Sequence, residues 1–376
     1  MKRHSFIASG VSAASIAAIA VPPSTATPQP SLRSGRSALI LIGGANRGAY
    51  QAGVIQAVVE AQGVSDGQAL DFDMVSGTSI GALNAYLVAT AQYSALKEVW
   101  YSGVIASRNL FRLKSPFNML QSPDAGVLNR LDAAYRLGTG LTRNVTGILN
   151  PEPINTMLHD YVDTKAVVHL PLYVSTTNLT AQQLQVFVLR ATSPDGIAKQ
   201  NVNDQLLSDD PFVRPITDDI IHRVFFATAA LPVLFDPILI PRTDDPSKLE
   251  QYCDGGVTEN LPFDAAQRCV DTLKVIVVDP PRPDISETYD NALEVCLGIF
   301  ATMQFRILEF QVRLAYALNE TTLPINPYLI RPQKSLPGKY TNFNQQSYLT
   351  WMWERGYADG KAGWQKFVPS AQLLPG

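Results

Sequence analysis

Short apolar runs alternate with segments of helical spacing near the start of the chain. Two runs, at 37–43 and 70–79, have the length and composition of buried strands. The segments that follow them, 48–63 and 80–92, repeat apolar residues with the period of a helix. Strand–helix–strand–helix within about fifty-five residues predicts a parallel sheet with right-handed crossovers.

The same patterns recur further along the chain. Apolar runs predict later strands at 170–179, 185–191 and 273–280. Residues 289–318 have the pattern of one long helix, which carries no charge between Glu294 and Arg306. Such a helix is either buried or lies against a lipid surface, and an apolar character on all sides favours burial.

Composition narrows the classes of protein. The chain has 376 residues, of which 46% are hydrophobic and 17% charged, so it can bury the core of one large domain or two smaller ones. A formal net charge of −3, without a basic run beyond the N-terminus, argues against a nucleic-acid partner. Cys253, Cys269 and Cys296 lack metal-site spacing, and buried thiols are favoured over a single disulfide.

The first thirty residues differ from the rest. A basic start, "MKRHSF", is followed by the small apolar run "IASGVSAASIAAIAV" and the breaker-rich "PPSTATPQP". This order predicts a signal peptide at 1–26, with cleavage after Ala20 or Ala26, and a linker at 27–37. We therefore expect an exported protein, periplasmic or secreted. The alternative is a disordered cytoplasmic tail.

A glycine-rich stretch, "LILIGGANRGAYQAG", raises the question of a bound nucleotide. A dinucleotide fingerprint needs glycines at its first, third and sixth positions, but from Gly43 the third position is Ala45. A P-loop needs lysine after its last glycine, and Gly48 is followed by Ala49. The sequence thus argues against a nucleotide. The stretch still predicts a helix N-terminus, whose free N–H groups stabilise negative charge.

The segment "GTSIG" has the pattern of a nucleophile elbow. Ser79 lies between Gly77 and Gly81, after a predicted strand and before a predicted helix. Glycines suit this sharp turn because it leaves no room for a Cβ on either side. The alternative is a chance glycine–serine turn, but the strand–helix context favours a catalytic serine.

The positions of the histidines in the sequence argue against a histidine as the general base for Ser79. In α/β-hydrolases the order is serine, acid, histidine. The chain has four histidines, and none lies in the 122 residues after the best acid candidate, Asp254. An ordinary triad is therefore disfavoured, and the histidines are interpreted as surface or structural residues; of these, His222 is the hardest to dismiss. They are His4, His159, His169 and His222.

Asp254 is a candidate partner for Ser79. It stands at the end of an apolar segment and is followed by Gly255 and Gly256, which allow neighbouring backbone to approach closely. Alone this pattern is only a common Asp-Gly turn, but beside a serine without histidine it suggests a dyad. A carboxylate with a pKa of about 3.9 is a weak base, so we expect a pocket that excludes water and raises the pKa of Asp254.

The glycine-rich loop then acquires a role. Acyl transfer creates an oxyanion, which backbone N–H groups stabilise. The turn at 43–48 lies one crossover from Ser79, on the same edge of the predicted sheet. We expect it to hold a transient negative oxygen.

Together these motifs resemble the patatin-like phospholipases. The family's oxyanion loop is similar to "GGANRGAYQAG", its nucleophile motif to "GTSIG", and its Asp-Gly-Gly to residues 254–256. The segments "ATAALPVLFDPI" at 227–238 and "VSTTNL" at 174–179 also resemble family motifs. The motifs follow the family's order over about residues 38–282.

The resemblance implies a three-layer α/β/α sandwich with a mainly parallel sheet. The catalytic domain would span 38–282, and a helical extension, 283–376, would pack on it. The resemblance also implies hydrolysis of lipid acyl esters at a lipid or membrane surface, without cofactor or metal. Ser79 would be the nucleophile and Asp254 the base, with oxyanion donors from the N–H groups of Gly43, Gly44 and Ala45.

Two residues of the loop qualify this expectation. Ala45 stands where the family has a third glycine, and its Cβ disfavours positive φ, so the oxyanion hole can differ in shape or activity. Arg47 matches the loop cation of the family and either orients the site or forms a structural salt bridge. Two alternatives to hydrolysis stay open, an acyltransferase and a catalytically silent lipid-binding module.

Overall fold

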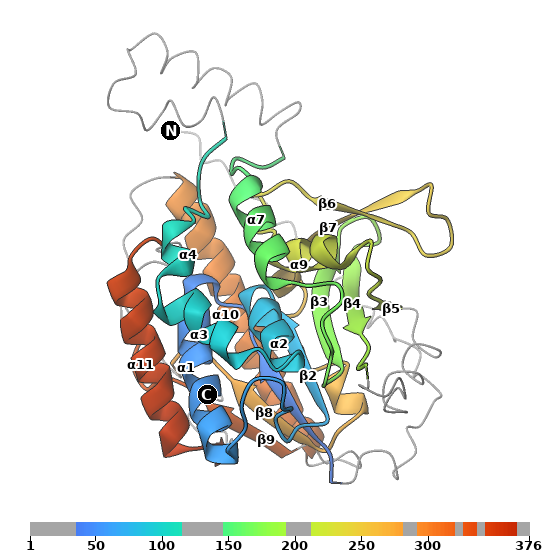
Figure 1. The fold of residues 1–376 in the computed structure, drawn as a ribbon. Coiled ribbons are helices and arrows are strands. Elements are labelled where there is room, and N and C mark those ends of the chain that lie inside the picture. The colour runs from blue at the N-terminus through green and yellow to red at the C-terminus, as the bar shows by residue number, and fades with distance from the viewer. Residues whose placement is uncertain are drawn as a thin grey trace, which may run out of the picture.

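A ten-stranded mixed sheet with flanking helices forms the centre of the molecule (Figure 1). The computed structural model describes residues 35–114, 146–192, 212–280, 292–319, 326–336 and 343–366. The sheet order is β10-β9-β8-β1-β2-β3-β4-β5, with β7 attached to β3 and β6 to β7. The predicted sandwich with a mainly parallel sheet is confirmed. The predicted signal peptide at 1–26 lies outside the described residues.

Five parallel strands make the middle of the sheet. They are β9 (Asn326–Ile330), β8 (Thr272–Ile276), β1 (Ser37–Leu41), β2 (Met74–Thr78) and β3 (Leu172–Asn178). Every residue of β2 and β3 is buried, as expected of parallel strands covered on both faces. Parallel strands end at a common edge, and the turns that leave this edge carry the site described below.

Antiparallel strands extend the sheet beyond β3. They are β4 (Gln183–Leu189), β6 (Ile238–Pro241) and β7 (Leu249–Asp254), while β5 (Val213–Pro215) runs parallel to β4. The last residues of β7 pair with β3 in a register that places Asp254 opposite Thr176. This pairing brings the Asp-Gly-Gly turn to the same edge of the sheet as the end of β2.

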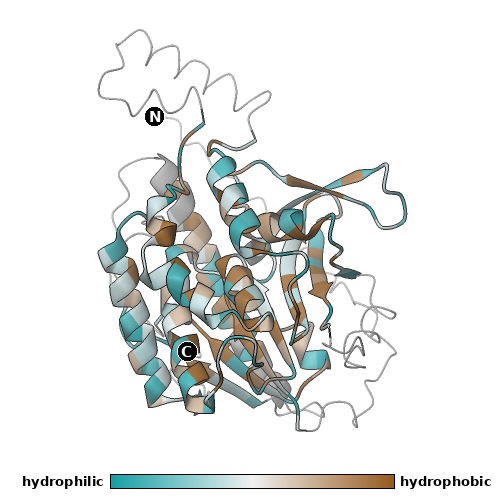
Figure 2. Ribbon diagram, viewed as in Figure 1, coloured by the Kyte–Doolittle hydropathy of each residue, from teal (hydrophilic) through white to brown (hydrophobic). Residues whose placement is uncertain are grey.

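Helices cover the sheet. They are α1 (Gly48–Gln62), α2 (Ile80–Ala89), α3 (Tyr93–Tyr101), α4 (Val104–Ser107), α7 (Glu152–Tyr161), α9 (Ile221–Ala229), α10 (Ala292–Asn319) and α11 (Gln346–Ala362). The helices predicted at 48–63 and 80–92 are confirmed as α1 and α2. All of α2 is buried, and Figure 2 shows it and the central strands as the apolar interior. Gly63 ends α1 with a φ of 66°, a conformation that glycine adopts without strain.

The chain beyond residue 282 is more than a helical extension. It contributes β9, which pairs with β8, and the short β10 (Gln365–Lys366). The pattern missed β9 because proline interrupts the segment "NPYLI". The long helix is confirmed as α10, but the expected burial on all sides is wrong for the side chains described, since one face is exposed. Among the described residues, no helix has the length and apolar character needed to cross a membrane.

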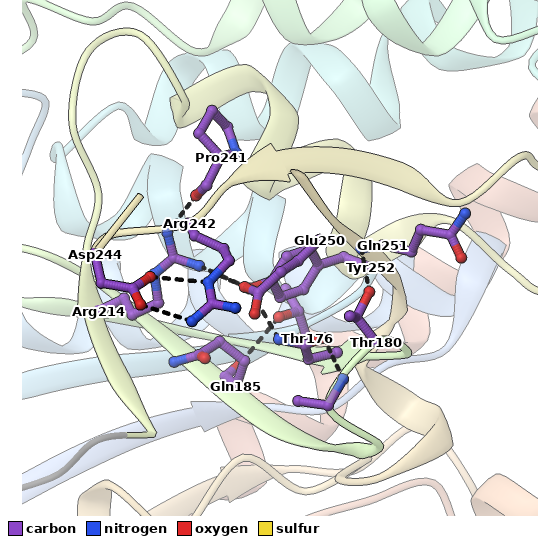
Figure 3. A network of polar contacts seen from close by, with 12 residues as sticks. Thr176, Thr180, Gln185, Arg214, Pro241, Arg242, Asp244, Glu250, Gln251 and Tyr252 are labelled. Carbon is purple, nitrogen blue, oxygen red and sulfur yellow. Dashed lines mark hydrogen bonds and ion pairs between the residues drawn. The ribbon is translucent and has the colours of Figure 1, made fainter. Parts of the chain in front are cut away.

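A polar network fixes the strand that leads to Asp254 (Figure 3). Arg214 donates to the hydroxyl of Tyr252 at 2.7 Å and to the carbonyl of Pro241 at 2.7 Å, and it pairs with Glu250 at 3.3 Å. Tyr252 in turn donates to Glu250 at 2.7 Å. These bonds join β5 to both strands of the β6–β7 hairpin, and so hold β7 in register.

Two glycines bring α1 and α11 into close contact. A Cβ on Gly53 would lie 1.9 Å from the carbonyl oxygen of Trp353, and a Cβ on Gly356 would lie 2.0 Å from that of Tyr50. The contact supports the site because α1 follows directly from the glycine-rich loop.

We predict that Gly356→Ala lowers the free energy of unfolding by about 1–3 kcal/mol through overpacking. Helix propensity alone would change it in the opposite direction, by about 1 kcal/mol in favour of alanine. Urea unfolding measures the difference. Ala358→Ser on the exposed side of α11 is the control and should change stability little. Equal or greater stability of Gly356→Ala would show that the two helices do not touch in this way.

Candidate active site

Ser79 occupies the strained turn between β2 and α2. Its φ of 54° and ψ of −130° are unusual for a residue with a side chain, and 9% of it is exposed. A Cβ on Gly77 would lie 2.5 Å from the Cα of Ala82, and one on Gly81 would lie 2.4 Å from the carbonyl oxygen of Leu41. The two glycines of the elbow therefore let β1, β2 and α2 approach each other closely.

Asp254 lies at the end of β7 with its side chain fully buried. One carboxylate oxygen, Oδ1, accepts the N–H of Gly256 at 2.7 Å, while Oδ2 has no hydrogen bond of normal geometry within the described structure. Burial raises the pKa of Asp254 to about 7, and the Gly256 N–H and the Ser79 hydroxyl act in the opposite direction. The fold thus brings Ser79 and Asp254 together, although they are 175 residues apart.

The Asp-Gly-Gly turn is wedged between β3 and α10. A Cβ on Gly255 would lie 2.2 Å from the carbonyl oxygen of Ser175, and one on Gly256 would lie 2.1 Å from Nε2 of Gln304. The turn begins the short helix η3 (Gly255–Val257), which the Asp254 side chain caps. Gly255 is required by the close backbone of β3 and not by its φ angle, whereas a Cβ on Gly256 would meet chiefly the end of the flexible Gln304 side chain.

The glycine-rich loop passes beside Ser79. A Cβ on Gly43 would lie 3.3 Å from the Cβ of Ser79 and 2.6 Å from Oδ1 of Asn260. A Cβ on Gly44 would lie 2.6 Å from Cγ2 of Val278. The loop therefore approaches Ser79 through backbone atoms, which is the arrangement that an oxyanion hole requires.

Ala45 and Arg47 form the short helix η2 (Ala45–Arg47) that leads into α1. Ala45 has a φ of 48°, so it adopts the conformation that its Cβ disfavours. Arg47 is buried and forms an ion pair with Asp279, just beyond β8. Of the two roles expected for Arg47, the structure contains the salt bridge, which ties the loop to the next strand.

Thr228 on α9 contacts Ser79, and sequence reasoning did not single it out. The N–H of Ser79 donates to Oγ1 of Thr228 at 2.9 Å, and this hydroxyl donates to the carbonyl of Ser175 at 2.6 Å. Thr228 is fully buried. A signal was present, because the segment 227–238 was recognised as a family motif and threonine stands there at the motif's serine position.

Glu259 is a second residue that sequence reasoning missed. Its carbonyl accepts the hydroxyl of Thr78 at 3.1 Å, and its carboxylate accepts the hydroxyl of Ser175 at 2.6 Å and the N–H of Asp264 at 3.0 Å. Burial, with the nearby Asp264 as the second cause, raises the pKa of Glu259 well above its usual range. The segment after Asp-Gly-Gly thus accepts a hydrogen bond from Thr78, the residue before Ser79.

His222 contacts His159 and the backbone of Val162. The ring of His222 lies 2.8 Å from the carbonyl oxygen of Val162 and packs on His159, with ring centroids 4.0 Å apart. His222 is six residues before Thr228 on α9, roughly 9 Å along the helix. Among the histidines that the structure describes, none forms a hydrogen bond with Ser79 or Asp254.

Two cysteines and the possible metal ligands can be placed in the described ranges. Cys253 and Cys269 are buried and carry no disulfide, and burial raises the pKa of Cys253 to about 12. The side chain of Cys296 lies outside the described part. No group of three His, Cys, Asp or Glu residues in that part is placed to hold a metal ion.

A small apolar cavity of about 50 Å³ opens at Ser79. Helices α2, α7 and α9 supply most of its walls, and the segments around residues 110 and 343 close it. Its lining is apolar apart from the serine: Ala45, Ile80, Leu83, Leu110, Phe111, Ile154, Met157, Leu158, Phe225, Ala229, Leu231, Phe235 and Phe343. The cavity fits hydrocarbon better than any polar group.

Solved structures and a family profile resemble this chain. No curated protein matches the chain. Among solved structures, VipD from Legionella pneumophila is 14% identical with a TM-score of 0.34, over 88% of this chain and 68% of that one. The type III effector ExoU is 12% identical with a TM-score of 0.22, over 89% and 55%. The sequence profile described as patatin-like phospholipase matches residues 39–266, more than half of the chain, and the protein therefore belongs to the patatin-like phospholipase family.

Proposed function

We propose that the protein is a serine hydrolase of lipid acyl esters, of the phospholipase A or lysophospholipase type, with Ser79 and Asp254 as its catalytic dyad. The observation that carries the proposal is the fully buried carboxyl group of Asp254 beside Ser79. Burial raises the pKa of this carboxyl group to about 7, and the Ser79 hydroxyl acts to lower it. A carboxylate with this pKa is a competent base at neutral pH.

The proposed reaction has two steps. Ser79 donates its proton to Asp254 and attacks the ester carbonyl, while the N–H groups of Gly43, Gly44 and Ala45 stabilise the oxyanion. The proton then passes to the leaving alcohol, which departs. Water, activated by the same carboxylate, hydrolyses the acyl-enzyme and restores the serine.

The apolar cavity supports an acyl substrate. Its walls begin at the nucleophile, so a hydrocarbon chain in the cavity would place its carbonyl carbon at the serine oxygen. Patatin-like phospholipases act on lipids, which agrees with an acyl chain in this position. No residue of the lining is charged, and burial of a charged group there would be unfavourable.

We predict that Ser79→Ala and Asp254→Asn each lower kcat on a p-nitrophenyl ester by at least about a thousand-fold. The double variant should be no slower than either single one, because the two residues act as a unit. Circular dichroism checks the fold. His222→Ala is the control and should keep most activity; a loss equal to that of Ser79→Ala would replace the dyad by a triad.

A second prediction concerns pH. Protonated Asp254 cannot accept a proton, so kcat/KM should fall as the pH falls below about 7. The raised pKa also means that the native state favours the neutral acid. Its contribution to stability is present below pH of about 4 and is lost as the pH rises through about 7.

Asp254→Asn tests the stability part of this prediction. The inactive variant should melt at a higher temperature than the wild type at pH 8, and the difference should shrink toward pH 4. Glu259 is common to both proteins, so its own titration cancels in the comparison. A wild type that is the more stable at pH 8 would show that the carboxylate is solvated or paired.

A third prediction concerns Thr228, which holds the backbone of the nucleophile. Thr228→Val preserves shape but removes the acceptor of the Ser79 N–H and the donor to Ser175. We expect kcat to fall about 10- to 100-fold with little change in KM, since misplacement of the nucleophile affects the chemical step. Thr228→Ser retains the hydroxyl and should restore most of kcat. Equal loss in both variants would point to packing instead.

A further inference from the structure

The exposed side of α10 is a continuous apolar surface. Val295, Ile299, Met303, Phe310 and Leu314 are between 39% and 67% exposed, and Phe310 is the most exposed of them. Their spacing of four or seven residues places them on one side of the helix, together with the exposed Thr302 and Arg306. We call these seven residues the outer face of α10.

The opposite side of α10 is fixed to the candidate active site. Gln311 accepts the N–H of Leu261 at 3.0 Å, and Gln304 lies against Gly256 in the Asp-Gly-Gly turn. Leu308 is fully buried. The outer face is therefore the reverse side of a helix that contacts the turn of Asp254.

The charges on α10 favour an anionic surface as its partner. Arg306 is exposed within the apolar row. The one acidic residue among the described side chains of α10 is Glu309, which is half-buried and paired with Arg331 at 3.3 Å. Among the side chains of α10 that the structure describes, large apolar groups thus share the exposed side with a cation and with no exposed acid, which favours a lipid interface.

A second copy of the chain fits this surface less well. Five partly exposed side chains form a patch on the order of 400 Å². A standard interface buries about 800 Å² on each partner. The outer face alone is therefore too small for a stable dimer, whereas insertion into a lipid surface needs no matching surface.

We propose that the outer face of α10 docks the protein on an anionic lipid surface. The helix would lie in the interface, with its apolar side chains among the acyl chains and Arg306 at the headgroups. The inference rests on the proposed function, since the substrate would come from the same surface. It adds that the docking helix contacts the Asp254 turn through its opposite side, so the turn would lie about one helix diameter, roughly 10 Å, from the lipid surface.

The experiment uses vesicle co-sedimentation in a Ser79→Ala background, so that binding is measured without hydrolysis. The vesicles contain phosphatidylcholine alone or with phosphatidylglycerol. We expect Met303→Gln/Phe310→Gln to weaken binding at least about 10-fold, because the apolar area supplies much of the affinity. Arg306→Gln should remove the preference for phosphatidylglycerol. Trp351→Gln, which removes a side chain with 46% exposure from α11, is the matched control and should bind like its parent.

Activity separates this inference from the proposed function. With Ser79 present, the α10 variants should hydrolyse a soluble p-nitrophenyl ester at the wild-type rate and lose activity on vesicles. If no ester is cleaved but the variants still lose vesicle binding, the proposed function fails and the docking surface stands. If the double variant binds as tightly as its parent, or if the parent binds no vesicles, the docking surface is wrong. A dimer that the double variant converts to a monomer, without vesicle binding, would assign the face to a second copy.

Discussion

A carboxyl group without access to water, beside a serine hydroxyl, is the constraint on which this structure depends. Asp254 is fully buried, and its charged form is correspondingly unfavourable. The surrounding structure must hold it in place: the N–H of Gly256 donates to it, and the network of Arg214 anchors the strand on which it lies. Burial disfavours the charged carboxylate and thereby raises its pKa to about 7. In the proposed reaction this pKa lets Asp254 accept a proton at neutral pH.

Local signals in the sequence predicted the parts of the site that the backbone itself determines. The elbow around Ser79 could be recognised because glycines are required on both sides, where a Cβ would lie 2.4–2.5 Å from neighbouring backbone. Asp254 became a candidate because no histidine follows it in the sequence, and the structure places His222 against Val162 and His159. The parallel core followed from alternating strands and helices. These features depend on residues that are close in sequence or on a count over the whole chain.

Features that depend on distant residues could not be predicted in this way. Thr228 acts through a bond to a backbone N–H 149 residues earlier, and the partner of Arg47 lies 232 residues further on. The strand β9 is recognisable only once β8 is there to pair with it. The periodicity of α10 showed that the helix exists, but which side meets the protein depends on Gly256 and Leu261. In each case the chemistry is ordinary and the pairing is long-range.

Strained backbone occurs at the two places where the proposed reaction needs it. Ser79 and Ala45 both have positive φ, although neither is glycine. Such conformations cost on the order of 1–3 kcal/mol each and persist only where the surroundings fix them. The bond to Thr228 fixes the first, and the buried ion pair of Arg47 with Asp279 secures the loop of the second. Alanine at position 45 therefore keeps the N–H that the proposed oxyanion hole needs, in a backbone conformation that its Cβ disfavours.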